Sequence, residues 1–474
     1  MIFTDRKNPI PLYRQIYNCI VNEILSGSMP AGHRLPATRK LAEDLSVGRN
    51  TVDKAYHQLE AEGYINSRTG SGFTVCDIPI GFEGTNYEKT MTYAEKHTET
   101  SASNRNDDTS AIPKYDFVYG SMDNDVFPYK QWRRCMNDIL TAMEVSENLH
   151  YPARMGEPEL QRAIAGYLKR ARNVSCDPGN ILILPGQQHA MEILSNIFDG
   201  DSKVFAMEDP GYDGIRKVFE KNGFRIIPVK VDNDGVSMVY IKNITADLLY
   251  LTPSHQFPTG AVLPIGKRRQ LLRWAAETGT YIIEDDYDSE LRYYTSPIPA
   301  MQSLDTAGMT IYTGTFSKSL APVMRTSYMI LPDILKERYM ERYGRYNAFV
   351  PVFHQKALAA FINEGFYEQH INRLRKIYRR KHAALLKAID DAFGKDITIL
   401  GGGAGIHILI KVKSNLTRKQ MIEAAEKKGI RVYDTDILYS DPASCPEHQL
   451  LLGFPTVPTE AFESIFRTLR EEWK

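Results

Sequence analysis

One stretch of polar residues divides this chain and constrains its fold more than any other feature. Residues 77–113 are rich in Ser, Thr, Asn, Glu and Gly and contain few aliphatic side chains. Such a segment buries too little apolar surface to offset the entropy lost on ordering, so we expect it to be a flexible linker. The parts on either side, residues 1–76 and 114–474, are therefore predicted to fold as separate domains.

The N-terminal part has the pattern of three helices followed by a hairpin. Apolar residues recur at helical spacing over residues 11–28, a second helix is expected over residues 38–45, and a third begins at residue 49. Two short extended runs, residues 64–66 and 72–76, flank a turn. This order is typical of a winged helix-turn-helix, whose third helix fits the major groove of DNA. A small helical adaptor is the alternative.

Polar side chains are found where such a domain would contact DNA. Arg49, Asn50 and Thr51 begin the third helix, where guanidinium and short polar groups reach base edges and phosphates. Arg39 on the second helix and Arg68 at the hairpin are predicted to face the DNA backbone. The zero net charge of the whole chain does not oppose this interpretation, because nucleic-acid binding depends on local charge.

The same region resembles the GntR-type winged helix. The resemblance rests on Pro-Leu-Tyr-Arg-Gln-Ile at residues 11–16, Gly-His-Arg-Leu-Pro-Ala-Thr-Arg-Lys-Leu-Ala at 32–42, Arg-Asn-Thr-Val at 49–52 and Leu-Glu-Ala-Glu-Gly-Tyr at 59–64. It implies binding to operator DNA as a dimer. The residues that match DNA-contacting positions are Arg39, Arg49, Asn50, Thr51, Arg68 and Gly70.

Beyond residue 114, short apolar runs alternate with amphipathic stretches, which indicates an α/β domain with a mostly parallel sheet. The runs are residues 181–184, 204–206, 248–251, 281–283, 310–312 and 327–331. Ligands of such sheets bind at the carboxyl ends of the strands. The remainder, from about residue 332 to 474, is predicted to form a smaller α+β subdomain.

Residues that suit a phosphate and an aldehyde follow three of these runs. Pro-Gly-Gln-Gln-His at residues 185–189 opens a helix whose backbone N–H groups can hold a phosphate, although plain chain reversal is the alternative. Tyr212 offers an aromatic face, with core packing as its alternative. Thr315, Ser317 and Arg325 could clamp a phosphate. Lys318, between them, could form a Schiff base with an aldehyde.

The fourth of these sites is acidic. Glu-Asp-Asp-Tyr-Asp occupies residues 284–288 at the end of an apolar run, where burying charge is costly without a cationic partner. A pyridinium nitrogen beside Asp285 would serve, with Tyr287 bonding the neighbouring phenolic oxygen. A solvated acidic loop or a magnesium site are alternatives. We assign no metal, and the five scattered cysteines lack CxxC pairing.

Taken in this order, the segments resemble fold-type I aminotransferases from about Tyr115 to the C-terminus. The resemblance implies pyridoxal 5'-phosphate (PLP) as the cofactor, and a homodimer. Lys318 matches the Schiff-base lysine and Asp285 the partner of the pyridine nitrogen. The other matches are Gly186, Gln187, Thr315, Ser317 and Arg325 for the phosphate, Tyr212 for ring stacking, Tyr287 with His255 or Gln256 for the ring oxygen, and Tyr151 for the phosphate of a partner subunit.

The fusion of the two parts is similar to the MocR-type, GabR-like regulators. Pro-Ser-His-Gln-Phe-Pro-Thr-Gly at residues 253–260 and Gly-Thr-Phe-Ser-Lys-Ser-Leu at 314–320 carry this resemblance. It implies a PLP-dependent transcription regulator that senses an amine, an amino acid or a vitamin B6-related effector through Lys318. A true aminotransferase with a regulatory DNA-binding domain is the alternative.

The sequence departs from the GABA-responsive members of this group. Two arginines expected to clamp a carboxylate are replaced by Asp213-Gly214 and Pro455-Thr456. Arg154, Arg216 and Arg431 are candidate substitutes. This departure argues against GABA and favours, as a second hypothesis, a role in sensing vitamin B6.

The chain has no feature of a membrane or secreted protein. Apolar runs are shorter than a membrane span, and residues 1–11 have no apolar block of the kind a secretory signal needs. We therefore expect a cytoplasmic location.

Overall fold

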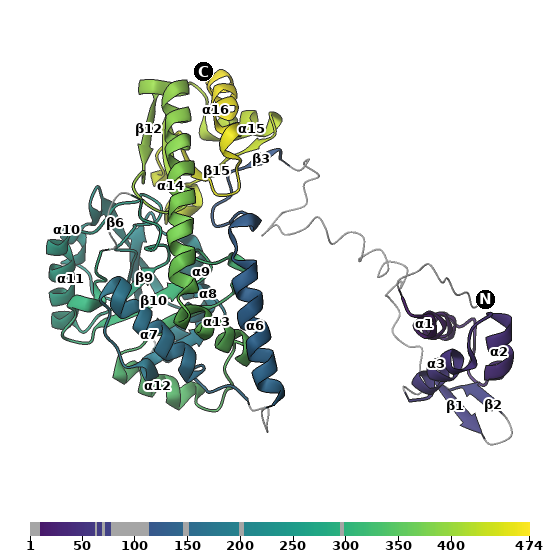
Figure 1. Ribbon diagram of the computed structural model, residues 1–474. Helices are drawn as coiled ribbons and strands as arrows, with labels where there is room; N and C mark the ends of the chain where they lie inside the picture. The colour runs from purple at the N-terminus through teal and green to yellow at the C-terminus, as the bar shows by residue number, and fades with distance from the viewer. Residues whose placement is uncertain are drawn as a thin grey trace. The chain divides into compact units, whose positions relative to one another are not determined.

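The computed structural model describes residues 10–61, 64–68, 72–76, 113–145, 151–198, 203–293 and 298–474. The chain divides into two compact units, residues 1–109 and 110–474 (Figure 1). Apart from Pro113, the predicted linker lies outside the described residues. None of the helices in the described part of the chain has the length and apolar character that crossing a membrane requires.

The N-terminal unit is a winged helix-turn-helix, as predicted. Its elements are α1 (Leu12–Leu25), α2 (Thr38–Asp44), α3 (Arg49–Ala61) and the antiparallel strands β1 (Ile65–Arg68) and β2 (Gly72–Val75). Ile16 and Ile20 of α1 pack with Val52 and Tyr56 of α3 in one buried cluster. The hydroxyl of Tyr56 donates to the carbonyl of Pro36 at 3.0 Å, which ties α3 to the segment before α2.

The second unit is built on a mixed, mostly parallel sheet of eight strands, again as predicted. In spatial order the strands are β4 (Ile181–Leu184), β11 (Ser327–Ile330), β10 (Thr310–Thr315), β9 (Tyr281–Asp286), β8 (Leu248–Leu251), β5 (Val204–Asp209), β6 (Arg225–Asp232) and β7 (Gly235–Val236). Strands β10, β9, β8, β5 and β6 pair in parallel, whereas β11 and β7 are antiparallel to their neighbours. The carboxyl ends of the parallel strands therefore meet at one edge.

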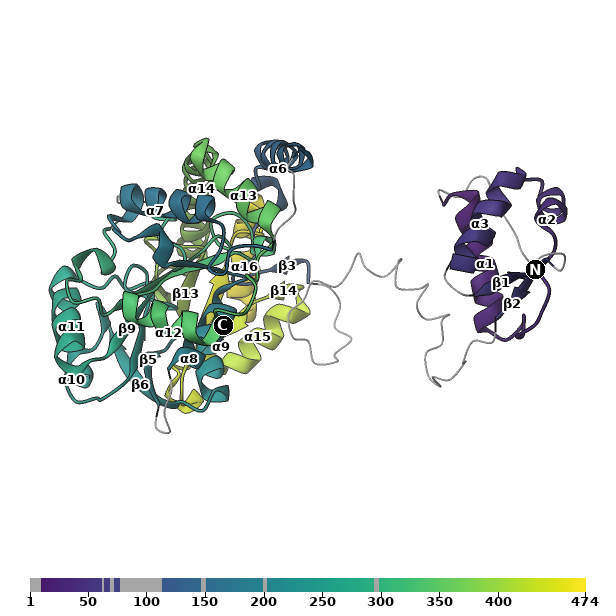
Figure 2. The same ribbon diagram turned by 90° about the horizontal axis from the view of Figure 1, so that it is seen from below.

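Helices cover both faces of this sheet (Figure 2). Because successive side chains of a strand point to opposite faces, Ile181 and Ile183 pack with one set of helices and Leu182 and Leu184 with the other. The first set contains α7 (Pro158–Arg172) and α13 (Val352–Asn363), with α11 (Ile265–Thr278) beside them over β8 and β9. The second set contains α8 (Gln187–Ile197), α9 (Asp213–Lys221) and α12 (Asp333–Tyr343).

A smaller antiparallel sheet is formed near the C-terminus. Its strands, in spatial order, are β12 (Ile397–Leu400), β13 (His407–Val412), β16 (Gln449–Gly453) and β15 (Tyr433–Asp434). It packs with α15 (Arg418–Lys427), α16 (Phe462–Glu472) and the long helix α14 (Phe366–Phe393). The elements after residue 332 thus divide between two cores, because α12 and α13 pack on the large sheet.

One helix joins these cores. Helix α14 contributes Tyr367 and Ile371 to the core of the large sheet and Leu374 and Tyr378 to that of the small one, and Figure 1 shows it running past both. At the start of the unit, β3 (Tyr115–Asp116) pairs in parallel with β14 (Ile430–Arg431).

Candidate functional site

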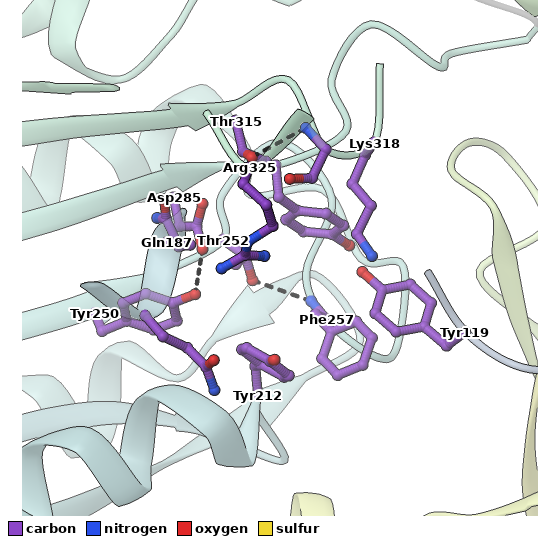
Figure 3. A pocket seen from close by; sticks show the side chains of 13 residues that line it. Tyr119, Gln187, Tyr212, Tyr250, Thr252, Phe257, Asp285, Thr315, Lys318 and Arg325 are labelled. Atoms are coloured by element: carbon purple, nitrogen blue, oxygen red, sulfur yellow. Dashed lines mark hydrogen bonds between the residues drawn. The ribbon is translucent and has the colours of Figure 1, made fainter. Parts of the chain in front are cut away.

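A cavity of about 140 Å³ lies at the carboxyl ends of the central parallel strands (Figure 3). The residues that line it are Tyr119, Gln187, Gln188, Tyr212, Tyr250, Thr252, Phe257, Asp285, Tyr287, Thr315, Ser317, Lys318 and Arg325. Eight residues proposed from the sequence are thereby brought together, namely Gln187, Tyr212, Asp285, Tyr287, Thr315, Ser317, Lys318 and Arg325. They lie at the end of different strands or after them, and they meet because these strands end at the same edge of the sheet.

Lys318 reaches into this cavity from the loop after β10. Its Nζ lies 4.2 Å from the centre of the Tyr119 ring. Burial lowers the pKa of Lys318 to about 8, although the carboxylates of Asp288 and Asp285 act to raise it. An amine with a pKa this close to neutral is in part uncharged, which is the form that attacks an aldehyde.

Asp285 is the carboxylate of the cavity and is only 4% exposed. The hydroxyl of Tyr250 donates to its Oδ2, and Oγ1 of Thr313 lies 3.4 Å from its Oδ1. Burial, aided by Asp286, raises the pKa of Asp285 to about 7. Among the described residues no Lys, Arg or His forms an ion pair with it, so a cationic nitrogen of a ligand would relieve its burial.

The neighbouring acids are buried too, and each has its own partners. Asp286 pairs with Nε of Arg172 at 2.7 Å, and Glu284 accepts bonds from backbone N–H groups at 2.7 and 2.8 Å. Asp288 lies 2.9 Å from Nδ1 of His255. This arrangement excludes a solvated acidic loop and leaves Asp285 as the acid that faces the cavity.

A cradle for an anion lies at the other side of the cavity. Gly186, with φ of 118°, precedes the first turn of α8, and a Cβ at this residue would lie 2.4 Å from Nη2 of Arg325. Arg325 forms no ion pair with another described residue, and Oε1 of Gln187 is buried without a hydrogen-bond partner. The guanidinium group and the helix N-terminus together fit a phosphate, whereas the amide oxygen of Gln187, an acceptor, requires a donor.

The two candidates for the ring oxygen beside Tyr287 do not line the cavity. His255 lies behind Tyr287, with its Nδ1 3.0 Å from the tyrosine hydroxyl. The amide of Gln256 is used by its own loop and by the segment after β5, because Nε2 donates to the carbonyls of Phe257 and Pro210 and Oε1 accepts from Thr259. Tyr287 is therefore the group that faces the cavity, and His255 contacts its hydroxyl without lining the cavity.

Tyr151 and the three candidate clamps lie outside the cavity. Tyr151 is 82% exposed. Arg154 is exposed, Arg216 donates to the carbonyl of Ile437 at 2.5 Å, and Arg431 lies 3.5 Å from Glu426. None of the three lines the cavity.

Sequence reasoning missed five of the lining residues, which are Tyr119, Gln188, Tyr250, Thr252 and Phe257. Thr252 directly follows β8 and Gln188 follows Gln187, so their places after strands were a usable signal. Tyr119 had none, because it comes from a segment that precedes every strand of the large sheet.

In the N-terminal unit the candidate DNA contacts are exposed. The side chains of Arg39 and Arg49 are 83% and 67% exposed, and their ion pairs among the described residues are with acids one turn along their own helices, at 3.5 and 3.4 Å. Asn50 is exposed and Thr51 half-buried at the start of α3. The side chain of Arg68, and Gly70 altogether, lie outside the described residues.

Known transcriptional regulators match this chain along almost its whole length. Residues 12–75 match the model of the gntR family of bacterial regulatory proteins, and residues 118–445 match that of aminotransferase class I and II. The HTH-type transcriptional regulator YdeL of Bacillus subtilis (strain 168) is 37% identical, covering 100% of this chain and 99% of that protein. The probable rhizopine catabolism regulatory protein MocR of Rhizobium meliloti is 31% identical over 99% of this chain and 95% of its own length.

A more distant relative and a solved structure complete the comparison. The pyridoxine biosynthesis transcriptional regulator PdxR of Corynebacterium glutamicum is 28% identical over 83% of this chain and 82% of that protein. The kynurenine aminotransferase of Pyrococcus horikoshii superposes with a TM-score of 0.69 at 22% identity, covering 83% of this chain and 95% of that one, which shows a shared fold. The chain therefore belongs to the MocR-type family of HTH-type transcriptional regulators, in which a gntR-family DNA-binding domain is fused to a class I and II aminotransferase domain.

Proposed function

We propose that this protein is a PLP-dependent transcription regulator that binds operator DNA and senses an amine, an amino acid or a B6 vitamer at Lys318. The observation that carries the proposal is the placement of Lys318, Asp285 and Arg325 around one cavity. Each offers a different chemistry, namely an amine of lowered pKa, a buried carboxyl in need of a cation, and a guanidinium group without an acidic partner among the described residues.

The residues of the cavity fit PLP part by part. Arg325 and the first turn of α8 would hold the phosphate, with Thr315 and Ser317 beside them. Asp285 would hold the ring nitrogen, and Tyr287 the ring oxygen. When bound, PLP supplies an aldehyde that exchanges between the amine of a lysine and the amine of a ligand. Lys318, with a pKa of about 8, can take up or release the proton that such an exchange requires at near-neutral pH.

A ligand at this site alters DNA binding only if its affinity differs between two arrangements of the protein. Its effect on operator affinity then equals the effect of operator DNA on its own affinity. For the effector we favour a B6-related ligand or an amine without a carboxylate, because Arg154, Arg216 and Arg431 do not line the cavity. The relationship to a regulator of pyridoxine biosynthesis supports the same choice.

We also propose that the protein acts in the cytoplasm as a homodimer in which Tyr151 of each subunit reaches the phosphate bound by the other. The exposed ring of Tyr151 and the exposed side chain of Val323, which lies two residues before Arg325, support an apolar contact between subunits. Analytical ultracentrifugation with and without PLP would test the dimer. A Tyr151→Ala variant that binds PLP as tightly as the wild type would contradict the role of Tyr151.

The direct test of the regulator is an electrophoretic mobility shift of an operator fragment with and without PLP. We expect PLP, or PLP with an effector amine, to change the operator affinity of the wild type and of Lys395→Ala, which alters a lysine outside the cavity. Lys318→Ala should lose the response while retaining DNA binding. An operator affinity of the wild type that is indifferent to PLP and to every amine and vitamer tested would overturn the proposal.

An aminotransferase remains the second candidate, and the lowered pKa of Lys318 favours it, because a lysine that exchanges protons near neutral pH can serve as a catalytic base. Incubation of the PLP-loaded protein with an amino acid and a keto acid distinguishes the two. Sustained turnover would support the enzyme, whereas at most a single stoichiometric exchange would support the sensor.

A further inference from the structure

The chain enters the aminotransferase-like unit along a segment that leads from the small sheet to Lys318. β3 pairs with β14, and the N–H of Phe117 donates to the carbonyl of Arg431 at 3.0 Å. The N–H of Gly453 donates in turn to the carbonyl of Phe117 at 2.8 Å. Two residues later, Tyr119 lines the cavity, so this segment is anchored at one end in the small sheet and ends at the lysine.

Tyr119 is held between the two sheets. Its ring lies 4.9 Å from that of Phe257, which follows β8 of the large sheet, and 5.1 Å from that of His407, which begins β13 of the small sheet. The amino group of Lys318 lies over the same ring, 4.2 Å from its centre (Figure 3). An ammonium group over an aromatic face is attracted to it, and more strongly when water is excluded.

The amino group of Lys318 also lies against the next residue, Gly120. Gly120 has φ of 95°, and a Cβ at this residue would lie 2.4 Å from Nζ of Lys318. The amino group thus occupies the space beside the backbone of residue 120 and over the ring of residue 119. Both contacts come from the same segment of chain.

We propose that Tyr119 is a positioning residue for Lys318, and that Tyr119 and Gly120, at the end of this segment, form the wall of the site that senses whether the lysine carries a free ammonium group. Residues 77–112 connect this segment to the DNA-binding unit along the chain. Attachment of PLP consumes the ammonium group and exchange with an amine frees it, so either event changes a contact at the point where that connection begins. This second step rests on the proposed function, whereas the positioning of Lys318 does not.

The test uses the proton affinity of Lys318, which a merely structural role of Tyr119 would leave unchanged. Besides Tyr119, the titratable or charged groups around the lysine are Asp285, Asp288, Tyr212, Tyr287, His407 and Arg325, and none of them is substituted in the variants of Tyr119. Loss of the aromatic face disfavours the ammonium form, so the lysine should become a free amine at lower pH. The rate at which PLP attaches covalently to Lys318, trapped with borohydride and measured by mass spectrometry across pH, reports this change.

We expect Tyr119→Leu to move the midpoint of this pH profile down by about one unit, a tenfold change in proton affinity of the size expected for a desolvated cation–π contact. Tyr119→Gln, which also lacks the ring, should give the same shift and serves if the leucine variant does not fold. Tyr119→Phe, which keeps the aromatic face, should match the wild type. So should Tyr115→Leu, a control on the same segment that does not line the cavity.

Two results would overturn the positioning role, namely a midpoint in Tyr119→Leu and Tyr119→Gln equal to that of the wild type, or an equal shift in Tyr119→Phe. The operator mobility shift separates this inference from the proposed function. A midpoint that shifts while wild-type operator binding ignores PLP would refute the regulator and keep the positioning role. An unshifted midpoint with PLP-dependent operator binding would refute the positioning role and keep the regulator.

Discussion

The guanidinium group of Arg325 occupies the space that a side chain at residue 186 would need, because a Cβ on Gly186 would lie 2.4 Å from Nη2 of the arginine. Residue 186 also has φ of 118° and ψ of 163°, a conformation that only glycine adopts without strain. The glycine thus lets the arginine approach the first turn of α8. This approach is what forms the anion cradle.

Gly186→Ala should therefore weaken the binding of PLP by displacing Arg325. We expect a loss of about tenfold in affinity, the equivalent of roughly 1.4 kcal/mol, from strain and from the displaced guanidinium group together. The measurement is a fluorescence titration with PLP and, in parallel, with pyridoxal, which has no phosphate. A variant that loses affinity equally for both ligands would show that the cradle does not hold the phosphate.

Asp285→Asn should weaken PLP binding by removing the charge that faces the ring nitrogen. A hydrogen bond to a charged group contributes about 1.5–3 kcal/mol, so we expect a loss of roughly ten- to a hundredfold in affinity. Isothermal titration calorimetry measures it, with Asp234→Asn as a control because Asp234 pairs with Lys267 away from the cavity. Unchanged affinity in Asp285→Asn would rule out this carboxylate as the partner of the ring.

The same substitution should change how the stability of the ligand-free protein depends on pH. Burial raises the pKa of Asp285 from its ordinary value of 3.8 to about 7, so between these pH values the folded state holds a proton that the unfolded state has lost. Stability should fall as pH rises from about 4 to about 7, and this fall should be smaller in Asp285→Asn. Thermal unfolding midpoints across this range test the prediction, and equal slopes in both proteins would contradict it.

Arg49→Ala should weaken operator binding without unfolding the N-terminal unit, because the side chain is 67% exposed and its one ion pair with a described residue is to the nearby Asp53. The expected loss is about 1–3 kcal/mol, or roughly five- to a hundredfold in affinity. Fluorescence anisotropy with a labelled operator measures it. Arg225→Ala, which removes an exposed arginine from the other unit, should bind like the wild type. Equal affinity of Arg49→Ala would exclude this helix end from the interface.

The sequence predicted best those elements whose signal is local. The apolar runs at residues 181–184 and 248–251 coincide with β4 and β8. A strand buried on both faces has apolar side chains at consecutive residues, which makes it visible in the sequence. Strand β6 was not predicted, since only Val229 of its eight residues is buried and it contains Pro228. The order of helices and strands in the N-terminal unit was recovered from periodicity and turn residues alone.

Features that depend on contacts distant in sequence could not be predicted from the sequence. Tyr119 belongs to the site because β3 pairs with β14, more than three hundred residues further along the chain. His255 and Gln256 are adjacent in sequence and equally polar, yet one supports Tyr287 and the other closes its own loop. Neither pattern nor composition distinguishes such roles, because they follow from which partners each side chain contacts in the folded chain.

The central claim is that Lys318 is the residue to which PLP attaches, and borohydride reduction followed by peptide mass spectrometry tests it most directly. In protein incubated with PLP, we expect a pyridoxyl phosphate group on the peptide that contains Lys318, and none at that peptide in Lys318→Ala. Modification spread over surface lysines, with Lys318 unmodified in the wild type, would contradict the account.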